Sequence, residues 1–388
     1  MNETWWVDPT QLDYDQKGVI DLPGHGSYLV LGPPGCGKTN LLLLRATYMV
    51  RSGKPNVQVI VLTRTLQEFI ASGSQKYAFT PDKVKTSQLW AIQLLNEYGI
   101  TPAKNKDFEK QRKALINQVT ELIEKEHLSN IFDIIFLDEA QDYLPEEIEV
   151  FNRLAVNLFA VADNRQKIYQ GDSPVNTLQK YVDKTCNLSY HYRNGQKICR
   201  LAEEVVKKND TQDHKFLSAT SNYDEVARPS TVELIKCGDF AEQCHQIIEK
   251  LKIQVQAYPD EMLGVVCPRH EELEIIWKHI RNSELGDKAL LQSGYAGYVA
   301  FDPKARICVC TVHSAKGLEF RAMVVAGAEY LRRFALNRDM VFTAITRAKT
   351  SFSVYYSKTI PGYLESAYSA LSPPPEKPKL EDLFGGGN

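Results

Sequence analysis

The sequence lacks several features that would point to particular classes of protein. No apolar stretch approaches the ~18 residues that a membrane-spanning helix needs, and LLLL at 41–44 fits a short helix instead. None of the eight cysteines forms a C-x-x-C pair, so a zinc or iron–sulfur site is not expected. The first residues show neither the charged nor the apolar segment of a secretory signal. This cysteine usage suits a reducing cytoplasm better than a disulfide scaffold.

Charge of one sign is not in excess either. With 46 Lys and Arg against 48 Asp and Glu, the formal net charge is -2. Free-standing nucleic-acid binders are often strongly basic, so this balance neither supports nor excludes such a partner and requires any basic groove to be local. At roughly 100–200 residues per domain, the 388 residues predict two or three domains.

Apolar runs alternate with helical patterns along most of the chain, which predicts an α/β fold with parallel sheets covered on both faces. The expected strands are 27–31, 57–62, 132–137, 156–162, 262–267, 306–312, 322–326 and 351–356. The expected helices are 38–52, 107–127, 195–208, 239–252 and 270–281. We therefore expect two domains, 1–190 and 191–370, with a small helical insertion at about 101–130 and a disordered Pro/Gly-rich tail at 371–388.

A glycine-rich segment follows the first apolar run. Residues 32–39 read GPPGCGKT, which matches G-x-x-x-x-G-K-[ST] between a strand and a helix. Glycines let backbone N–H groups curl round an anion, Lys38 can reach the β- and γ-phosphates, and the Thr39 hydroxyl can ligate Mg²⁺. The pattern predicts a site for ATP with Mg²⁺. Its residues are Gly32, Pro33, Pro34, Gly35, Cys36, Gly37, Lys38, Thr39 and Asn40.

Two adjacent carboxylates follow another apolar run, in the segment IIFLDEAQD at 134–142. The strand delivers them to its carboxyl end, where open α/β sheets bind ligands. Asp138 is expected to hold Mg²⁺, directly or through water, and Glu139 to orient and deprotonate the attacking water. The two motifs together predict a nucleoside triphosphatase but do not say what its energy drives.

Further motifs occur in a set order after these two. They are QKIY at 166–169, Tyr192-Arg193, TVHSAKGLEF at 311–320 and TRA at 346–348. Together with DEAQD they resemble the superfamily 1 helicases, in particular the UvrD/Rep-like branch, from about Gln16 to about Tyr356. The resemblance implies two RecA-like P-loop NTPase domains in tandem. Beside full helicases of the family, the chain looks like a minimal form without the large accessory domains.

The resemblance also implies roles around the nucleotide. Gln16 looks like the glutamine that reads adenine, and Tyr192 like the aromatic residue that stacks on it. Arg193 resembles a γ-phosphate ligand, and Arg347 resembles the arginine that the second domain supplies. The remaining members of the implied site are Gln166, which would couple the γ-phosphate to nucleic acid, Glu319, which would contact the ribose, and Gly317.

Nucleic acid would lie across the tops of both domains. Hydroxyl groups and backbone amides at loop ends contact phosphates without reading bases. Trp90 could stack on a base, although a core position suits it as well, and His313 could equally be a satisfied core histidine. The residues that resemble the strand-binding motifs of the family are Thr63, Arg64, Thr86, Trp90, Thr311, His313 and Ser314.

One segment departs from the family. After Ile168-Tyr169 the family carries arginines and a tryptophan that stack on bases, whereas this chain reads QGDSP at 170–174. We therefore expect an ATP-dependent helicase or translocase on single-stranded DNA that separates strands with a partner protein, such as a nuclease or effector subunit. One alternative is a helicase-like ATPase that gates an effector in DNA repair, mobile-element or anti-phage defence systems. The other, a P-loop kinase or metabolic ATPase, is disfavoured by the motifs of the second domain.

Overall fold

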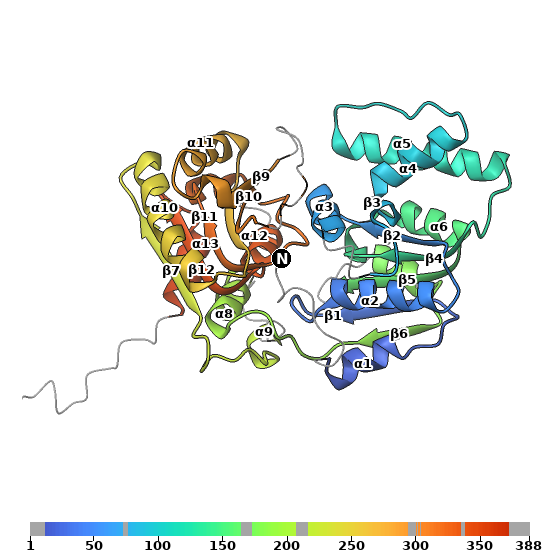
Figure 1. The fold of residues 1–388 in the computed structure, drawn as a ribbon, viewed down its shortest axis with the longest axis horizontal. Helices are drawn as coiled ribbons and strands as arrows, with labels where there is room; N and C mark the ends of the chain where they lie inside the picture. Colours follow the sequence, from blue (N-terminus) through green and yellow to red (C-terminus); the bar gives the residue numbers. More distant parts are fainter. Residues whose placement is uncertain are drawn as a thin grey trace, which may run out of the picture.

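The protein consists of two α/β halves that lie side by side, each built on its own six-stranded sheet (Figure 1). The structure, a computed structural model, describes residues 12–72, 77–163, 173–206, 216–293, 300, 302, 304–334 and 338–371. Every strand pairing within the two sheets is parallel. The predicted α/β class, with two parallel sheets in tandem as in RecA-like domains, is confirmed.

The first sheet has the strand order β3-β2-β4-β5-β1-β6. Its inner strands are rich in buried Val, Ile, Leu and Phe, because helices cover both faces. Successive side chains point to opposite faces, so Val30 and Leu31 belong to different buried clusters. The strands are β1 (Tyr28–Gly32), β2 (Val57–Val61), β3 (Val84–Thr86), β4 (Phe132–Leu137), β5 (Ala155–Asp163) and β6 (Lys184–Asn187).

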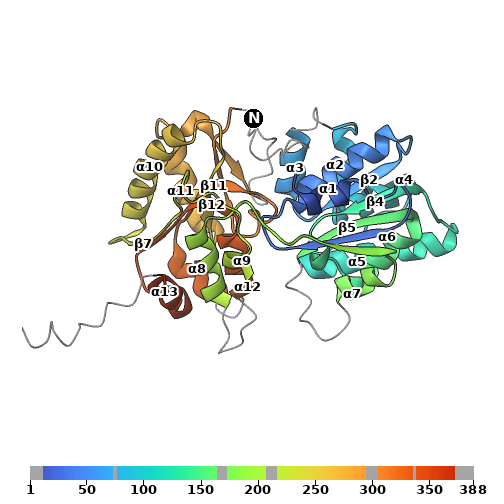
Figure 2. The same cartoon turned by 90° about the horizontal axis from the view of Figure 1, so that it is seen from below.

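Helices pack on both faces of the first sheet (Figure 2). One face is covered by α1 (Tyr14–Ile20), α2 (Lys38–Arg51) and α3 (Arg64–Ser72). The other is covered by α4 (Ser87–Glu97), α5 (Phe108–Lys125), α6 (Pro145–Leu154) and α7 (Pro174–Gln179), with the 3-10 turn η4 (Ala140–Asp142). A second 3-10 turn, η3 (Pro81–Lys83), directly precedes β3. The stretch expected as an insertion contains α5, which buries five apolar residues of one face and so contributes to the core.

The second sheet has the order β7-β12-β11-β8-β10-β9. Its strands are β7 (Thr231–Lys236), β8 (Leu263–Cys267), β9 (Ala289–Gln292), β10 (Ile307–Thr311), β11 (Phe320–Val325) and β12 (Ala348–Tyr356). One face carries α8 (Gln196–Val206), α12 (Arg338–Ile345) and α13 (Gly362–Ser369), and the other α10 (Phe240–Ala257) and α11 (His270–Arg281). Shorter pieces are α9 (Phe216–Ala219), η7 (Gly286–Lys288) and η8 (Ala328–Phe334). In the parts of the chain described, no helix has both the length and the apolar character needed to cross a membrane.

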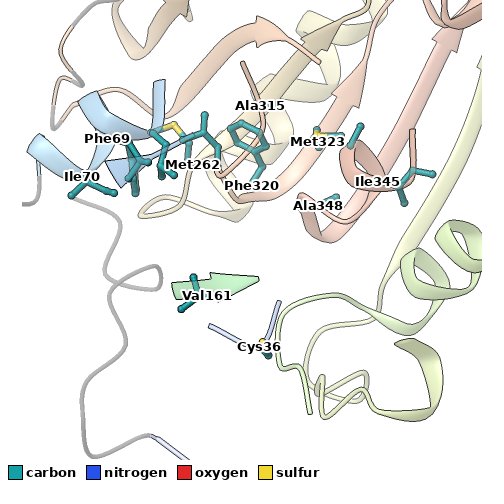
Figure 3. Close-up of a cluster of buried hydrophobic side chains, with 14 of the residues drawn as sticks. Cys36, Phe69, Ile70, Val161, Met262, Ala315, Phe320, Met323, Ile345 and Ala348 are labelled. Carbon is teal, nitrogen blue, oxygen red and sulfur yellow. The ribbon is translucent and has the colours of Figure 1, made fainter. Parts of the chain in front are cut away.

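One cluster of buried side chains extends over both halves. It joins Leu66, Phe69 and Ile70 of α3 to Met262 and Phe320 of the second half. Figure 3 shows part of it. Because the two halves share this apolar cluster, they meet through packed side chains and not only through the polar groups described below.

The connection from β10 to β11 is unusually short. Residues 312–319 return from the carboxyl end of β10 to the amino end of β11 through turns alone, whereas parallel strands are usually joined by a dozen or more residues that include a helix. The crossover contacts the first half, since Thr63 Oγ1 donates to the Lys316 carbonyl at 3.1 Å. Gly317 has φ +82, and a Cβ there would lie 2.6 Å from Leu66 Cδ2, so only glycine fits without rearrangement.

Candidate functional site

The P-loop lies where the sequence predicted it, between β1 and α2. Gly35 and Gly37 have φ +85 and +81, which glycine adopts without strain, and a Cβ on Gly35 would lie 2.8 Å from Asn194 Oδ1. The Lys38 ammonium donates to the carbonyls of Gly32 and Pro33, each at 2.9 Å. The ammonium group is therefore held over the loop whose backbone N–H groups suit an anion. The side chain of Asn40, also expected at the site, is buried on α2.

Thr39, at the start of α2, and Asp138, directly after β4, face each other. The Thr39 hydroxyl lies 3.1 Å from both carboxylate oxygens of Asp138. Asp138 is 1% exposed, and burial, with a contribution from Glu139, raises the pKa of its carboxyl to about 7. A hydroxyl and a carboxylate are oxygen ligands of the kind that Mg²⁺ prefers, and a divalent cation would offset the buried negative charge. These two residues therefore fit the predicted metal role.

Glu139 occupies a strained position. Its backbone is left-handed, with φ 48 and ψ 48, a conformation that non-glycine residues rarely adopt and that clusters at functional sites. Gln141 Nε2 donates to Glu139 Oε2 at 2.6 Å, and Arg347 Nη2 lies 3.5 Å from Glu139 Oε1. Burial acts to raise the pKa of Glu139, but Arg347 and then Lys38 outweigh it, so the pKa lies below its ordinary value.

The structure thus brings Arg347 of the second half against Glu139 of the first. Beside them, Arg193 Nη1 lies 2.6 Å from Glu319 Oε1, and Lys349 Nζ lies 3.3 Å from Glu319 Oε2. These side chains are at least three-quarters buried, so each charge is matched by an opposite one. The roles of Arg193 as a phosphate ligand and of Glu319 as a ribose ligand stay predictions, because here the two side chains pair with each other.

Gln16 and Tyr192 lie on the outer side of the P-loop. Gln16 Nε2 donates to the Cys36 carbonyl at 3.0 Å, and its Oε1 accepts from the Asp13 N–H at 3.0 Å. Tyr192 is 40% exposed; its N–H donates to the Gly35 carbonyl at 3.3 Å and its hydroxyl to Asp13 Oδ2 at 2.6 Å. Both residues therefore stand next to the loop, as adenine contacts would have to. Gln166 lies outside the described residues.

The polar residues expected to contact nucleic acid lie near strand ends. Thr63 follows β2 and Thr86 ends β3; their hydroxyls accept from the N–H groups of Leu66 and Leu89, at 3.2 and 3.3 Å, and so cap α3 and α4. Arg64 forms a partly exposed pair with Glu68 at 2.8 Å.

On the second half, Thr311 ends β10 and its Oγ1 donates to Ser314 Oγ at 3.1 Å. The side chains of Thr311 and Ser314 are mostly buried, whereas His313 between them is exposed and not in the core. These residues begin the crossover that contacts Thr63 through Lys316.

The position of Trp90 contradicts the expected contact between its indole ring and a base. Its side chain is 2% exposed and packs edge-on against Phe151, with ring centroids 5.0 Å apart. A buried indole offers no face to a base, so the expectation of base stacking is wrong for this structure and the core alternative holds.

Comparisons with known proteins fit this arrangement. Residues 306–355, which include the crossover and Arg347, match the sequence model of the UvrD-like helicase C-terminal domain. A probable DNA helicase of Mycoplasma pneumoniae is 25% identical over 254 residues, 57% of this chain and 45% of that protein. The putative ATP-dependent DNA helicase YjcD of Bacillus subtilis is 31% identical over 140 residues, 34% of this chain and 18% of that protein. These matches support the resemblance of the chain to UvrD/Rep-like helicases.

The chain spans less than half the length of either of these relatives. Among solved structures, the C-terminal domain of a possible DNA helicase from Lactobacillus plantarum aligns with TM-score 0.34 and 18% identity, over 46% of this chain and 96% of that one. The DUF1998 helicase MrfA bound to DNA aligns with TM-score 0.49 and 12% identity, over 93% of this chain and 51% of that one. Neither likeness is close enough to carry a functional conclusion.

Two residues of this site were not singled out from the sequence. Asn194 is fully buried, and its Nδ2 donates to the carbonyls of Thr346 and Ala348 at 2.7 and 2.6 Å, which fixes the segment that carries Arg347. Lys349 is the second cation beside Glu319. Asn194 directly follows Tyr192-Arg193, and Lys349 directly follows TRA. This proximity to a motif was the only indication of their role in the sequence.

Proposed function

We propose that this chain is a nucleic-acid-dependent ATPase that works as a helicase or translocase motor on single-stranded DNA. One observation carries the proposal: Arg347 of the second sheet lies 3.5 Å from Glu139 of the first, so the site is completed across the boundary between the halves. A site of this kind links hydrolysis to the relative position of the halves, as a motor requires.

The residues of the first half would bind ATP with Mg²⁺ and activate the attacking water. Lys38 and the P-loop N–H groups would hold the phosphates, as they favour negative charge. Thr39 and Asp138 would hold Mg²⁺, which when bound neutralises charge on the β- and γ-phosphates. Glu139, with its lowered pKa, is ionised at neutral pH and would accept the proton of the attacking water.

The residues of the second half would act on the transferred phosphoryl group. A guanidinium stabilises the charge that spreads over the phosphoryl oxygens in the transition state, and such an arginine is worth about 10³–10⁵-fold in rate. Arg347 would take this role. Arg193, now paired with Glu319 at 2.6 Å, would take the γ-phosphate when ATP displaces that pair.

Single-stranded DNA would run over the loops that hold Thr63, Thr86 and the segment from Thr311 to Ser314. These hydroxyls and amides suit a phosphate backbone and read no sequence. DNA is the expected strand because both curated relatives are called DNA helicases. The segment QGDSP after Tyr169 has no aromatic wedge, so strand separation would use a partner protein such as a nuclease or effector.

The test is the steady-state ATPase rate with and without single-stranded DNA, single-stranded RNA and duplex DNA. Lys38→Ala serves as the blank, and Arg51→Ala, at the exposed end of the same helix, is the matched control that keeps activity. Strong stimulation by single-stranded DNA supports the motor. A rate that is the same with every nucleic acid would overturn it and favour a protein-activated gating ATPase.

A further inference from the structure

Arg112 on α5 lies between the end of the DEAQD segment and a buried carboxylate. Its Nη2 donates to the Asp142 carbonyl at 2.9 Å and to Glu147 Oε2. The side chain of Arg112 is 11% exposed and that of Glu147 is 1% exposed. The guanidinium is thus held between α6 and the residues that follow Glu139 in the chain.

Glu147 extends these contacts to α4. Its Oε1 accepts from the hydroxyl of Ser87, the first residue of that helix, and its Oε2 also accepts from the Leu144 N–H at 2.8 Å. Ser87 directly follows Thr86, whose hydroxyl caps α4 and which is one of the predicted strand contacts. The carboxylate of Glu147 therefore ties the start of α4 to Arg112.

Asp142 extends the contacts in the other direction. Its Oδ2 lies 3.4 Å from Lys316 Nζ on the crossover of the second half, and the Lys316 carbonyl accepts from the Thr63 hydroxyl. A continuous series of polar contacts thus runs from Ser87 through Arg112 to the second half, and it passes the catalytic segment on the way.

Stability alone gives little reason for this arrangement. A buried ion pair is often no more stable than apolar residues of the same volume, and α5 already packs through five buried apolar side chains. What an arginine adds is a planar guanidinium, and here its Nη2 donates to both acceptors and so holds them together. One acceptor is the Asp142 carbonyl of DEAQD, and the other is Glu147, which contacts Ser87 at the start of α4.

We propose that Arg112 is a positioning residue that couples the predicted strand-contact segment at Thr86 and Ser87 to the DEAQD segment. A DNA strand bound at the start of α4 shifts Ser87. The contacts that Glu147 and Arg112 make then pass this shift to Asp142. The position of Asp142 then affects both its contact with Lys316 and the alignment of Glu139. This inference rests on the proposed function, because it explains how strand binding would raise ATP turnover.

The experiment compares Arg112→Gln with the wild-type chain in the ATPase assay, with and without single-stranded DNA. Basal kcat and the KM for ATP should stay at wild-type values, while stimulation by the strand should fall by about 2- to 30-fold, the range reported for residues in coupling networks. Coupling is reciprocal in binding. The change in strand affinity caused by a non-hydrolysable ATP analogue should therefore shrink as well, which loss of packing alone would not produce.

Two further variants keep the test decisive. Arg112→Gln leaves the Glu147 carboxylate buried without its cation, so the double variant with Glu147→Gln removes both charges and should fold while still lacking the coupling. Arg153→Gln is the matched control, because Arg153 also joins α6 to α5, through Glu124 at 3.8 Å, but forms an exposed pair away from DEAQD.

Full stimulation of the double variant by the strand would overturn the role of Arg112. So would an equal fall in basal and stimulated rates, which indicates a structural role only. A wild-type chain that no nucleic acid stimulates would instead refute the proposed function and remove the basis for the coupling with it.

Discussion

Replacing Arg347 by glutamine should change the pH dependence of ATP turnover as well as its rate. Arg347 and Glu139 are 10% and 13% exposed, and their charged groups lie 3.5 Å apart. Burial acts to raise the pKa of Glu139, and Arg347 is the largest of the groups that lower it. Without the guanidinium, the effect of burial is less opposed and the carboxyl takes up a proton at a higher pH.

The geometry sets the size of the effect. Two unit charges 3.5 Å apart attract by about 5 kcal/mol at an effective dielectric constant of ~20. This attraction favours the ionised carboxylate, so its loss raises the pKa of Glu139. Because Lys38 remains and water can enter the space, the acid limb should move to higher pH by less than full loss of the attraction would give. Separately, the maximal rate should fall by about 10³–10⁵-fold.

The assay is single-turnover hydrolysis of γ-labelled ATP with enzyme in excess, over a pH range that extends below the ordinary glutamate pKa of 4.5, so that the wild-type acid limb is included. Arg347→Lys is the matched variant: it keeps the charge but not the fork, so it should lose rate while its acid limb stays near that of the wild type. Arg228→Gln, which removes an exposed arginine 3.8 Å from Glu261 in the second half, controls for the change in net charge. An acid limb of Arg347→Gln that coincides with the wild-type limb would refute the electrostatic role of Arg347.

Three more outcomes are expected. Glu139→Gln should bind ATP like the wild type but not hydrolyse it, as nucleotide-binding and phosphate-release assays would show; full hydrolysis would exclude Glu139 as the base. Arg321→Ala should lower the free energy of unfolding in urea by about 3–5 kcal/mol, because it removes the nearest cation, at 2.7 Å, from buried Glu261; a change within error would contradict this. Asp138→Asn should flatten the pH dependence of the melting temperature of the metal-free protein. The pKa of Asp138 is about 7 against an ordinary 3.8, so the folded wild type binds more protons between these values and loses stability as pH rises through them; equal slopes in both proteins would rule this out.

The sequence predicted the inner elements of the fold well and the edges poorly. The expected strand 132–137 and helix 270–281 coincide with β4 and α11, because β4 contains a continuous apolar run and the apolar residues of α11 recur at helical spacing. The edge strands β3, β6, β7 and β9 were missed. β6 reads KTCN and is mostly exposed or half-buried, so its pairing with β1 and not its own composition makes it a strand.

The candidate site, like the fold, could be predicted from the sequence only in part. The P-loop and Asp138-Glu139 could be predicted because each motif carries its own strand, turn and chemistry. The meeting of Arg347 with Glu139 could be anticipated only through the resemblance to helicases. Arg112 and Asn194 could not be found, since their partners are far away in the sequence and an isolated arginine or asparagine carries no pattern.

The short return from β10 to β11 limits how independently its two ends can move. The eight residues between Thr311 and Phe320 span at most about 26–29 Å when fully extended. The return past a strand as long as β10 already takes roughly 17–20 Å. The turn at Gly317 takes up a further part of the length of the segment. Roughly 6–12 Å of contour therefore remains for the turns. A displacement of Thr311 larger than this remainder must also displace Glu319.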